Sequence, residues 1–259
     1  MARYFSDQPV LARIGALSLV CALVLVPVIL VDPTEVLGIN RWIKPIKFFA
    51  SIAVFVWTIA VYLSVLPGHE TFKRRIGWSM AAIFTVEMAA IVMQSLRGVP
   101  SHFNFSTPVD GFVFGVMGVA IVINTLLVAW ILILFLRENP QLPPAIVVGL
   151  RLGLFVFVAA SIQGGYMSSR PGHAVGVADG GPGIPFLNWS TIAGDLRVAH
   201  FLGLHSIQAI PLFAVFADRI APSASKILVW LFAIAYVTAF LFVLAQALNG
   251  RPFLSESML

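Results

Sequence analysis

The sequence predicts an all-α integral membrane protein, a bundle of seven transmembrane helices. Three observations predict this class: 59% of the 259 residues are hydrophobic, only 10% are charged, and the mean hydropathy is +0.97. Soluble chains carry about 25% charged residues. Apolar stretches recur along the whole chain and leave few residues for a water-soluble domain. We therefore expect a single polytopic membrane domain over residues 1–259.

Apolar runs of about 18 residues or more define the predicted spans. Each span should be helical, because a segment surrounded by hydrocarbon can satisfy its backbone hydrogen bonds only internally. Pro27 and Pro211 lie inside the first and sixth spans and should kink them. The seven spans are expected near residues 10–31, 43–66, 76–99, 111–136, 143–168, 196–217 and 225–248.

Basic residues near the span ends predict that the N-terminus is inside and the C-terminus outside. In this orientation nine Lys and Arg residues fall inside and seven outside, and the cluster 73–75 lies in a short inner loop. The excess of basic residues, a net charge of +5, is then explained by the orientation of the chain in the membrane, so no nucleic-acid partner is expected. Cys21 is the single cysteine, which excludes a disulfide framework. Together with the compact loops, this favours a bacterial inner membrane.

The longest connection, between the fifth and sixth spans, is expected outside the membrane. It runs from Ser169 to Asp195 and contains the glycine-rich piece 180–183. Loops of this length are usually binding or lid elements, and a flexible connection without function is the alternative.

Histidines and carboxylates gather on the predicted outer side, and this asymmetry is the main indication of function. Imidazole and carboxylate groups ligate divalent metals, and a bound metal makes water a nucleophile near neutral pH. The expected metal ligands are His102, His173, His200 and His205, and the expected catalytic carboxylates are Asp110, Asp179 and Asp195.

His200 and His205 are five residues apart, so one helix directs them about 140° from each other. A single ion bound by both is therefore disfavoured. For each of them a structural hydrogen bond, for example with Gln208 one turn after His205, is an equal alternative.

Cationic and amide side chains on the same side are expected to hold an anionic or lipidic small molecule. Four polar residues on four different helices would lie about 8 Å beneath the outer boundary and could meet in one pocket: Lys47, Gln94, Gln163 and His200. Snorkelling toward the interface is the alternative for Lys47. The expected substrate-binding residues are Lys47, Gln94, Arg97, Asn104, Gln163, Arg170 and Arg197.

The third and fifth spans end in similar pieces, in which Gln94 precedes Asp110 by the same distance as Gln163 precedes Asp179. A degenerate internal repeat would place two His/Asp loops opposite each other. Coincidence is the alternative, because the histidine positions differ by two. Deeper in the bundle, Glu87 and Arg151 are expected to form a buried ion pair, either as a structural lock or as part of a transport pathway.

These residues favour a membrane-embedded enzyme with an outward-facing His/Asp pocket, dependent on a divalent metal such as zinc and acting on an anionic or lipidic molecule. A haem b or quinone redox protein is the first alternative, although only one span carries histidines that could ligate haem. A small-molecule transporter using Glu87, Asn124 and Arg151 is the second. A homo-oligomer, or an accessory subunit of a larger membrane complex, leaves little trace in sequence.

Overall fold

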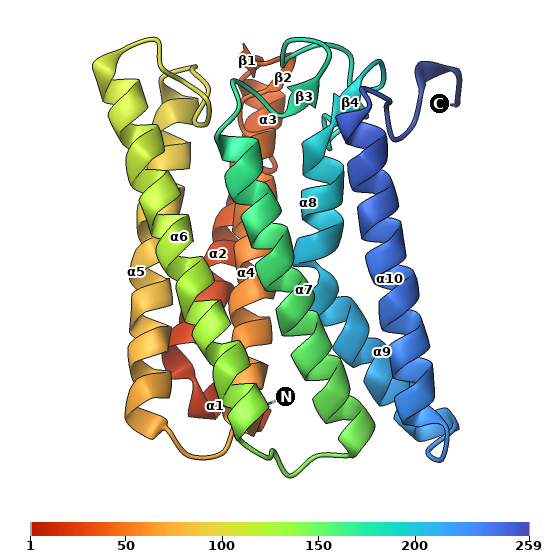
Figure 1. Ribbon diagram of the computed structural model, residues 1–259. Helices are drawn as coiled ribbons and strands as arrows, with labels where there is room; N and C mark the ends of the chain where they lie inside the picture. Colours follow the sequence, from red (N-terminus) through yellow and green to blue (C-terminus); the bar gives the residue numbers. More distant parts are fainter. Residues whose placement is uncertain (1, 259) are drawn as a thin grey trace. The chain divides into compact units, whose positions relative to one another are not determined.

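The structure, a computed structural model, describes residues 2–258 and is built almost entirely of α-helices (Figure 1). Within these residues six helices are long and apolar enough to cross a membrane, and a seventh span results if the bent pair α8–α9 is counted as one. The prediction of a helical membrane protein is confirmed at this level. Its orientation stays a prediction.

The long helices follow the predicted apolar runs. The largest difference is at α5, which begins at Glu70 rather than near residue 76, because the charged stretch before the apolar run is also helical. The five uninterrupted long helices are α4 (Ile43–Val65), α5 (Glu70–Leu96), α6 (Pro108–Arg137), α7 (Pro144–Ser168) and α10 (Ser225–Leu248).

The chain forms two compact units, Met1–Leu127 and Val128–Leu259, and α6 contributes to both. Each unit is described by itself, so the expectation of a single membrane domain stays a prediction. The first unit contains α1 (Ala2–Asp7), α2 (Pro9–Leu25) and α3 (Val28–Val31) in addition to α4 and α5. In this unit α2 packs along α4, and both contact α5.

Gly15 explains how closely α2 approaches α4. A Cβ atom at this position would lie 2.3 Å from Nε1 of Trp57, so only glycine lets the indole ring lie against the α2 backbone. The same Nε1 donates a hydrogen bond to the carbonyl of Ala12 (3.2 Å). A small residue at a helix crossing point is typical of membrane helix packing.

The first predicted kink is confirmed. A turn at Val26 and Pro27 separates α2 from α3, as expected for a residue without an amide hydrogen. The chain then forms an antiparallel hairpin of β1 (Glu35–Val36) and β2 (Ile39–Asn40). Leu37 and Gly38 between the strands both have positive φ angles, 52° and 76°, which is the backbone of a tight hairpin turn.

The second unit is built around α7, which packs against α8 (Leu196–Leu204), α9 (Ser206–Ile220) and α10. Small residues again lie at the crossing points. A Cβ on Gly203 of α8 would be 2.3 Å from that of Ala160 on α7, and one on Gly149 of α7 would be 2.7 Å from that of Ala214 on α9. Apolar clusters of α7, α9 and α10 residues complete the core.

The predicted kink at Pro211 is wrong in position. Pro211 lies inside α9, and the chain bends by 44° at His205, between α8 and α9. The carbonyl of Leu202, which would accept from the Ser206 amide in a continuous helix, accepts a 2.6 Å hydrogen bond from the hydroxyl of Tyr236 on α10. A side chain inserted into the backbone hydrogen-bond ladder is an established cause of helix bending.

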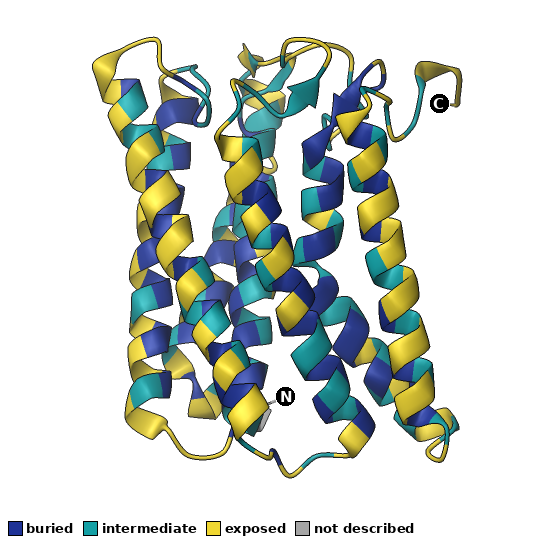
Figure 2. Cartoon of the chain, in the orientation of Figure 1, coloured by how far each residue is buried: buried dark blue, intermediate teal, exposed yellow. Residues whose placement is uncertain are grey.

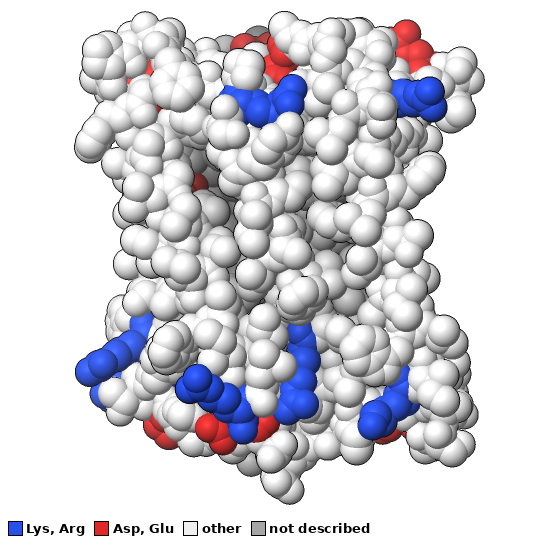
Figure 3. All heavy atoms as spheres, in the orientation of Figure 1, with Lys and Arg blue, Asp and Glu red and all other residues white. Residues whose placement is uncertain are grey.

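The surfaces of the long helices are those of lipid-facing segments. Figure 2 shows exposed residues recurring along the sides of the helices, and many of them are large and apolar, such as Leu30, Phe112 and Ile162. Figure 3 shows Lys, Arg, Asp and Glu atoms near the helix ends, with almost only uncharged atoms between them. Exposed apolar side chains over such a length are unfavourable in water and favourable in a bilayer.

Candidate functional site

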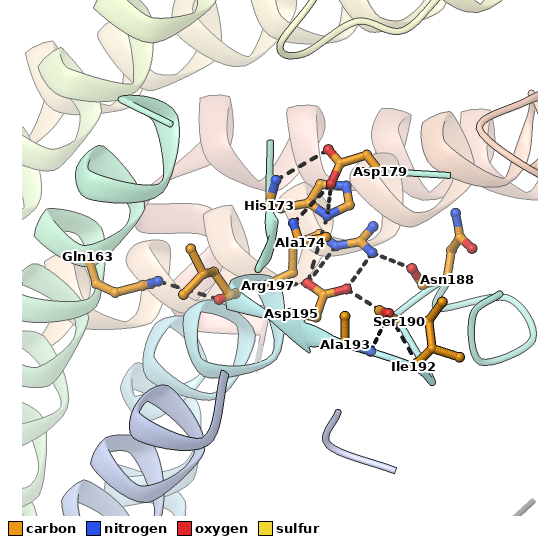
Figure 4. Close-up of polar contacts among 11 residues, drawn as sticks. Gln163, His173, Ala174, Asp179, Asn188, Ser190, Ile192, Ala193, Asp195 and Arg197 are labelled. Carbon is orange, nitrogen blue, oxygen red and sulfur yellow. Dashed lines mark hydrogen bonds and ion pairs between the residues drawn. The ribbon is translucent and has the colours of Figure 1, made fainter. Parts of the chain in front are cut away.

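Polar side chains of the second unit converge around Asp195, at the start of α8 (Figure 4). We call this group the Asp195 cluster; it consists of His173, Asp179, Asn188, Ser190, Asp195 and Arg197. Asp195 belongs to β4 (Gly194–Asp195), which pairs antiparallel with β3 (Ala174–Val175). The long glycine-rich connection is thus ordered by strand pairing, and every member of the cluster except Arg197, which lies on α8, comes from this connection.

Asp195 is the centre of the cluster and is only 1% exposed. The guanidinium of Arg197 donates to both carboxylate oxygens, with Nε 2.9 Å from Oδ1 and Nη2 2.6 Å from Oδ2. The amides of Ser190 and Arg197 also donate to the carboxylate, and the second of these bonds caps the N-terminus of α8. Nη2 of Arg197 also donates a hydrogen bond to the carbonyl of Asn188.

These contacts determine the charge state of Asp195. Burial disfavours the carboxylate, but the hydrogen bonds and charge of Arg197, the nearby His173 and the Ser190 amide together hold the pKa of Asp195 below its usual value. Asp195 is therefore ionised at neutral pH and forms an ion pair with Arg197, whose side chain is 26% exposed.

His173 lies between two carboxylates. Its Nδ1 is 3.1 Å from Oδ1 of Asp179 and 3.9 Å from Oδ1 of Asp195. The amides of His173 and Ala174 donate to Asp179, which positions that carboxylate beside the ring. Gly172 makes this approach possible, because a Cβ there would be 2.8 Å from a carboxylate oxygen of Asp179.

A small hollow opens beside the ring of His173. It is lined by His173, Ala174, Ala178, Asp179, Gly180, Gly181, Asn188, Ser190 and Arg197. Its enclosed space is about that of one water molecule. The hollow therefore has the size for a water or for one end of a larger molecule.

In the first unit, Asp110 has a structural role that its neighbours explain. It is buried at the start of α6, accepts from Gln94 (2.9 Å) and Arg97 (2.5 Å) at the end of α5, and binds the hydroxyl of Thr107 (2.6 Å). It thus ties α5 to α6. The amide group of Asn104 bonds to the loop itself, at Pro100 and Ser106.

The first unit contains a second Asp–Arg contact, between Asp32 and Arg41, and neither residue was among the predicted site residues. Arg41 binds Asp32 (2.5 Å) and also donates to the carbonyls of Ser95 and Leu96, the last residues of α5. Hydrogen bonds from Thr34, Trp42 and Arg41 hold the pKa of Asp32 well below its usual range. Opposite charges on either side of a short glycine-containing hairpin are the only sequence signal for this contact.

The loop between α5 and α6 folds inward at His102. The imidazole lies between the rings of Phe48 on α4 and Phe114 on α6, with both centroids 5.8 Å away. Its Nδ1 is 3.2 Å from Nζ of Lys44 and 3.1 Å from Oγ of Ser101. His102 therefore belongs to the helices of the first unit as much as to its loop.

His200 and His205 each have the structural hydrogen bond that was one of the two alternatives. Nδ1 of His200 is 3.0 Å from the carbonyl of Ala160, and its ring packs on Gly164 of α7. Nδ1 of His205 is 3.2 Å from Oε1 of Gln208, and its ring packs on Phe201. These bonds use one nitrogen of each ring to join α8 to its neighbours and to α9.

The remaining predicted residues have varied surroundings. Gln163 donates a long 3.4 Å bond to Leu196, and its Oε1 has no hydrogen-bond partner among the described residues. Arg170 donates to the hydroxyl of Tyr166. Lys47, on α4, has contacts of its own. The common pocket expected for residues of both units stays a prediction.

Among residues 2–258, no three His, Cys, Asp or Glu side chains form a group that could hold a metal ion. The expected four-histidine metal site therefore has no support in the arrangement of the described side chains. His102 is part of the first unit, and the other three histidines are part of the second.

The proposed repeat has different chemistry in its two copies. Gln94 binds Asp110 directly, whereas Gln163 binds the Leu196 carbonyl and Asp179 binds the amides of its own loop. The equal spacing thus does not produce equal contacts, which favours coincidence.

Arg151 and Glu87, the predicted ion pair, have the following contacts. The guanidinium of Arg151 donates to the carbonyls of Phe135 (2.7 Å) and Glu138 (3.1 Å), and so caps the C-terminal end of α6. Glu87 is buried, and its Oε1 has no hydrogen-bond partner within the described part of the chain. The pair itself stays a prediction.

The fold and the distribution of polar groups define a multi-pass helical membrane protein with ordered connections at the helix ends. Comparisons with protein families, with curated proteins and with solved structures found no match to the chain. The residues themselves therefore carry the functional argument.

Proposed function

We propose that the protein is a membrane-embedded enzyme that uses the Asp195 cluster to act on an anionic or lipidic small molecule by acid–base chemistry. One observation carries this proposal: His173 lies against the Asp179 carboxylate and beside a hollow of the size of a water molecule. An imidazole oriented by a carboxylate is the usual arrangement for removing a proton from water or from a hydroxyl group.

The roles follow from the contacts. His173 accepts the proton of a water in the hollow, and that water attacks an ester or phosphoester bond of the substrate. The Asp179 carboxylate, 3.1 Å from Nδ1, stabilises by its charge the imidazolium that forms, and the same proton then passes to the leaving group. Arg197 uses Nε and Nη2 to bind Asp195, which leaves its third nitrogen, Nη1, for an anionic substrate group. Asp195 positions Arg197.

A divalent metal such as zinc remains part of the proposal as an alternative to this metal-independent route. His173 and Asp179 would then be its protein ligands, and water or substrate would complete its coordination. Elemental analysis with an absorption spectrum distinguishes the alternatives. Stoichiometric zinc supports the metal route, a Soret band supports the haem alternative, and neither supports His173 as a base without metal.

The lipid bilayer is the proposed surrounding, with the N-terminus inside and the Asp195 cluster on the outer face of a bacterial inner membrane. Labelling by a membrane-impermeant maleimide tests this orientation in intact cells, after Cys21 is replaced by serine. A cysteine at Ala178, in the long connection, should react. One at Glu138, between α6 and α7, should react only after the cells are permeabilised, and the reverse pattern would contradict the orientation.

Activity is tested on the full-length protein in nanodiscs that contain anionic phospholipid, with product release followed by mass spectrometry. His173→Gln should lower the rate by about 100-fold or more, since a positioned base contributes this much. His69→Asn is the matched control, because Asn tolerates the left-handed backbone that His69 adopts and His69 is outside the cluster. Equal rates for wild type and His173→Gln would overturn the proposal.

A further inference from the structure

Glu87 in the first unit is a buried carboxyl group that the proposed enzyme chemistry does not use. It lies on α5 and is 2% exposed, and Oε1 has no hydrogen-bond partner among the described residues. A carboxylate in such a place is costly unless a cation is near or a proton binds. The groups around Glu87 therefore determine whether a nearby cation or a bound proton offsets this cost.

Two contacts establish the depth of Glu87. Asp110 binds Gln94, so the start of α6 is level with Gln94. Arg41 binds the last carbonyls of α5, so the start of α4 is level with the end of α5. Glu87 lies seven residues before Gln94. At about 1.5 Å per residue it is then about 10 Å deeper in the unit.

Lys44 and His102 occupy the space between this depth and the end of the unit where the β1–β2 hairpin lies. Lys44 lies in the first turn of α4, level with the end of α5, and its long side chain can extend from there toward the depth of Glu87. Its ammonium nitrogen is 3.2 Å from Nδ1 of His102, and His102 reaches the hydroxyl of Ser101 in the loop. Phe48 and Phe114, five and six residues after the starts of α4 and α6 and so about one and a half turns below them, hold the imidazole at this depth.

We propose that Glu87 is a proton-binding site inside the first unit, which exchanges its proton with the hairpin end of the unit along Lys44 and His102. Lys44 transfers a proton to the Glu87 carboxylate and regains one through His102, which takes it from water at the loop. No bond between heavy atoms is made or broken. The charge within the unit rises by one when the proton binds.

Toward the opposite end of the unit, Glu87 is preceded on α5 by buried apolar side chains. Phe84, Met80 and Ile76 precede Glu87 on α5 and are buried. The other charged or titratable groups on the elements packed against α5 are Lys47 and Tyr62 of α4, Arg13 and Cys21 of α2, and Asp110 at the start of α6. Lys44 contacts a loop residue, His102, so we place the proton exchange at the hairpin end.

Infrared spectroscopy of the full-length protein in nanodiscs tests the proposal. In spectra recorded as the pH is lowered, a carboxylic acid band should appear at high frequency, because Oε1 lacks a hydrogen-bond donor. Glu87→Gln should remove that band. Glu256→Gln, which changes an exposed carboxyl group, should leave it unchanged. A band that is missing at every pH, or present and independent of pH, would overturn the proposal.

The path is tested by deuterium uptake at the same band after transfer to heavy water. His102→Phe keeps the ring between Phe48 and Phe114 but cannot pass a proton, so uptake should slow at least about tenfold. Phe105→Leu, in the same loop, is the control and should exchange at the wild-type rate. Unchanged uptake in His102→Phe would exclude the path through His102. If Glu87→Gln does not fold, Glu87→Asp must shift the band instead.

Discussion

The hydroxyl of Tyr236 on α10 donates a 2.6 Å hydrogen bond to the carbonyl of Leu202 on α8. This contact occupies a backbone acceptor two residues before the end of α8, where the chain turns by 44° into α9. It positions α8, and with it Arg197 and His200, relative to α7 and α10. The bend thus coincides with a tertiary contact between neighbouring helices and lies six residues before Pro211.

Removing this hydroxyl should destabilise the second unit. We expect Tyr236→Phe to lower the free energy of unfolding by about 1 kcal/mol, the usual contribution of one hydrogen bond. Thermal unfolding in detergent, followed by intrinsic fluorescence, measures the change. Tyr166→Phe, at a half-exposed tyrosine, is the control and should change it by less than about 0.5 kcal/mol.

The Asp195–Arg197 contact should be costly to break. Asp195→Asn leaves the partly exposed Arg197 guanidinium beside a neutral group, and the loss of hydrogen bonds to a charged group costs about 1.5–3 kcal/mol. The loss should appear as a lower unfolding temperature and as proteolysis within residues 169–195. An exposed carboxyl variant, Glu256→Gln, should unfold like wild type.

Acid should weaken the same cluster. Because the pKa of Asp195 is lowered in the folded protein, its ionised form contributes stability above the ordinary aspartate range, near pH 4, and this stability is lost as the pH falls through the folded pKa. Unfolding temperatures measured from about pH 7 down to pH 3 should therefore fall less steeply for Asp195→Asn than for wild type. Parallel curves would contradict this assignment.

Glycine at the α7–α8 crossing point should be indispensable. Gly203→Ala places a methyl group 2.3 Å from the Cβ of Ala160, and such overpacking costs about 1–3 kcal/mol. Gly115→Ala, on α6, meets no atom within 4 Å and should be neutral or stabilising by about 0.5 kcal/mol or more. Unfolding temperatures of the two variants test the difference, and equal values would show that α8 can move away from α7.

Much of the fold follows from the order of residues along the chain. A run of apolar residues is helical in a bilayer whatever its neighbours are, since backbone hydrogen bonds within the segment are its only option. The limits of α4, α7 and α10 were predictable for this reason. The break at Pro27 was predictable too, because a missing amide hydrogen acts locally.

The partners of the polar residues were not predictable in the same way. His102 lies in a loop by sequence, but Lys44 and two aromatic rings hold it inside the first unit. Asp110 and Asp195 both precede a run of apolar residues, yet one ties two helices together and the other lies beside a histidine. Equal spacing of Gln and Asp in the two halves of the chain did not lead to equal contacts.

The chain by itself determined the class of protein, the positions of the apolar runs, and the gathering of polar residues near their ends. Only the tertiary structure decided which carboxylate meets which cation, where α8 bends away from α9, and that Glu87 has a buried oxygen without a partner. Hydropathy acts on each segment separately, whereas hydrogen bonds and ion pairs need two groups within about 3 Å. Such proximity is created by the packing of segments far apart in sequence.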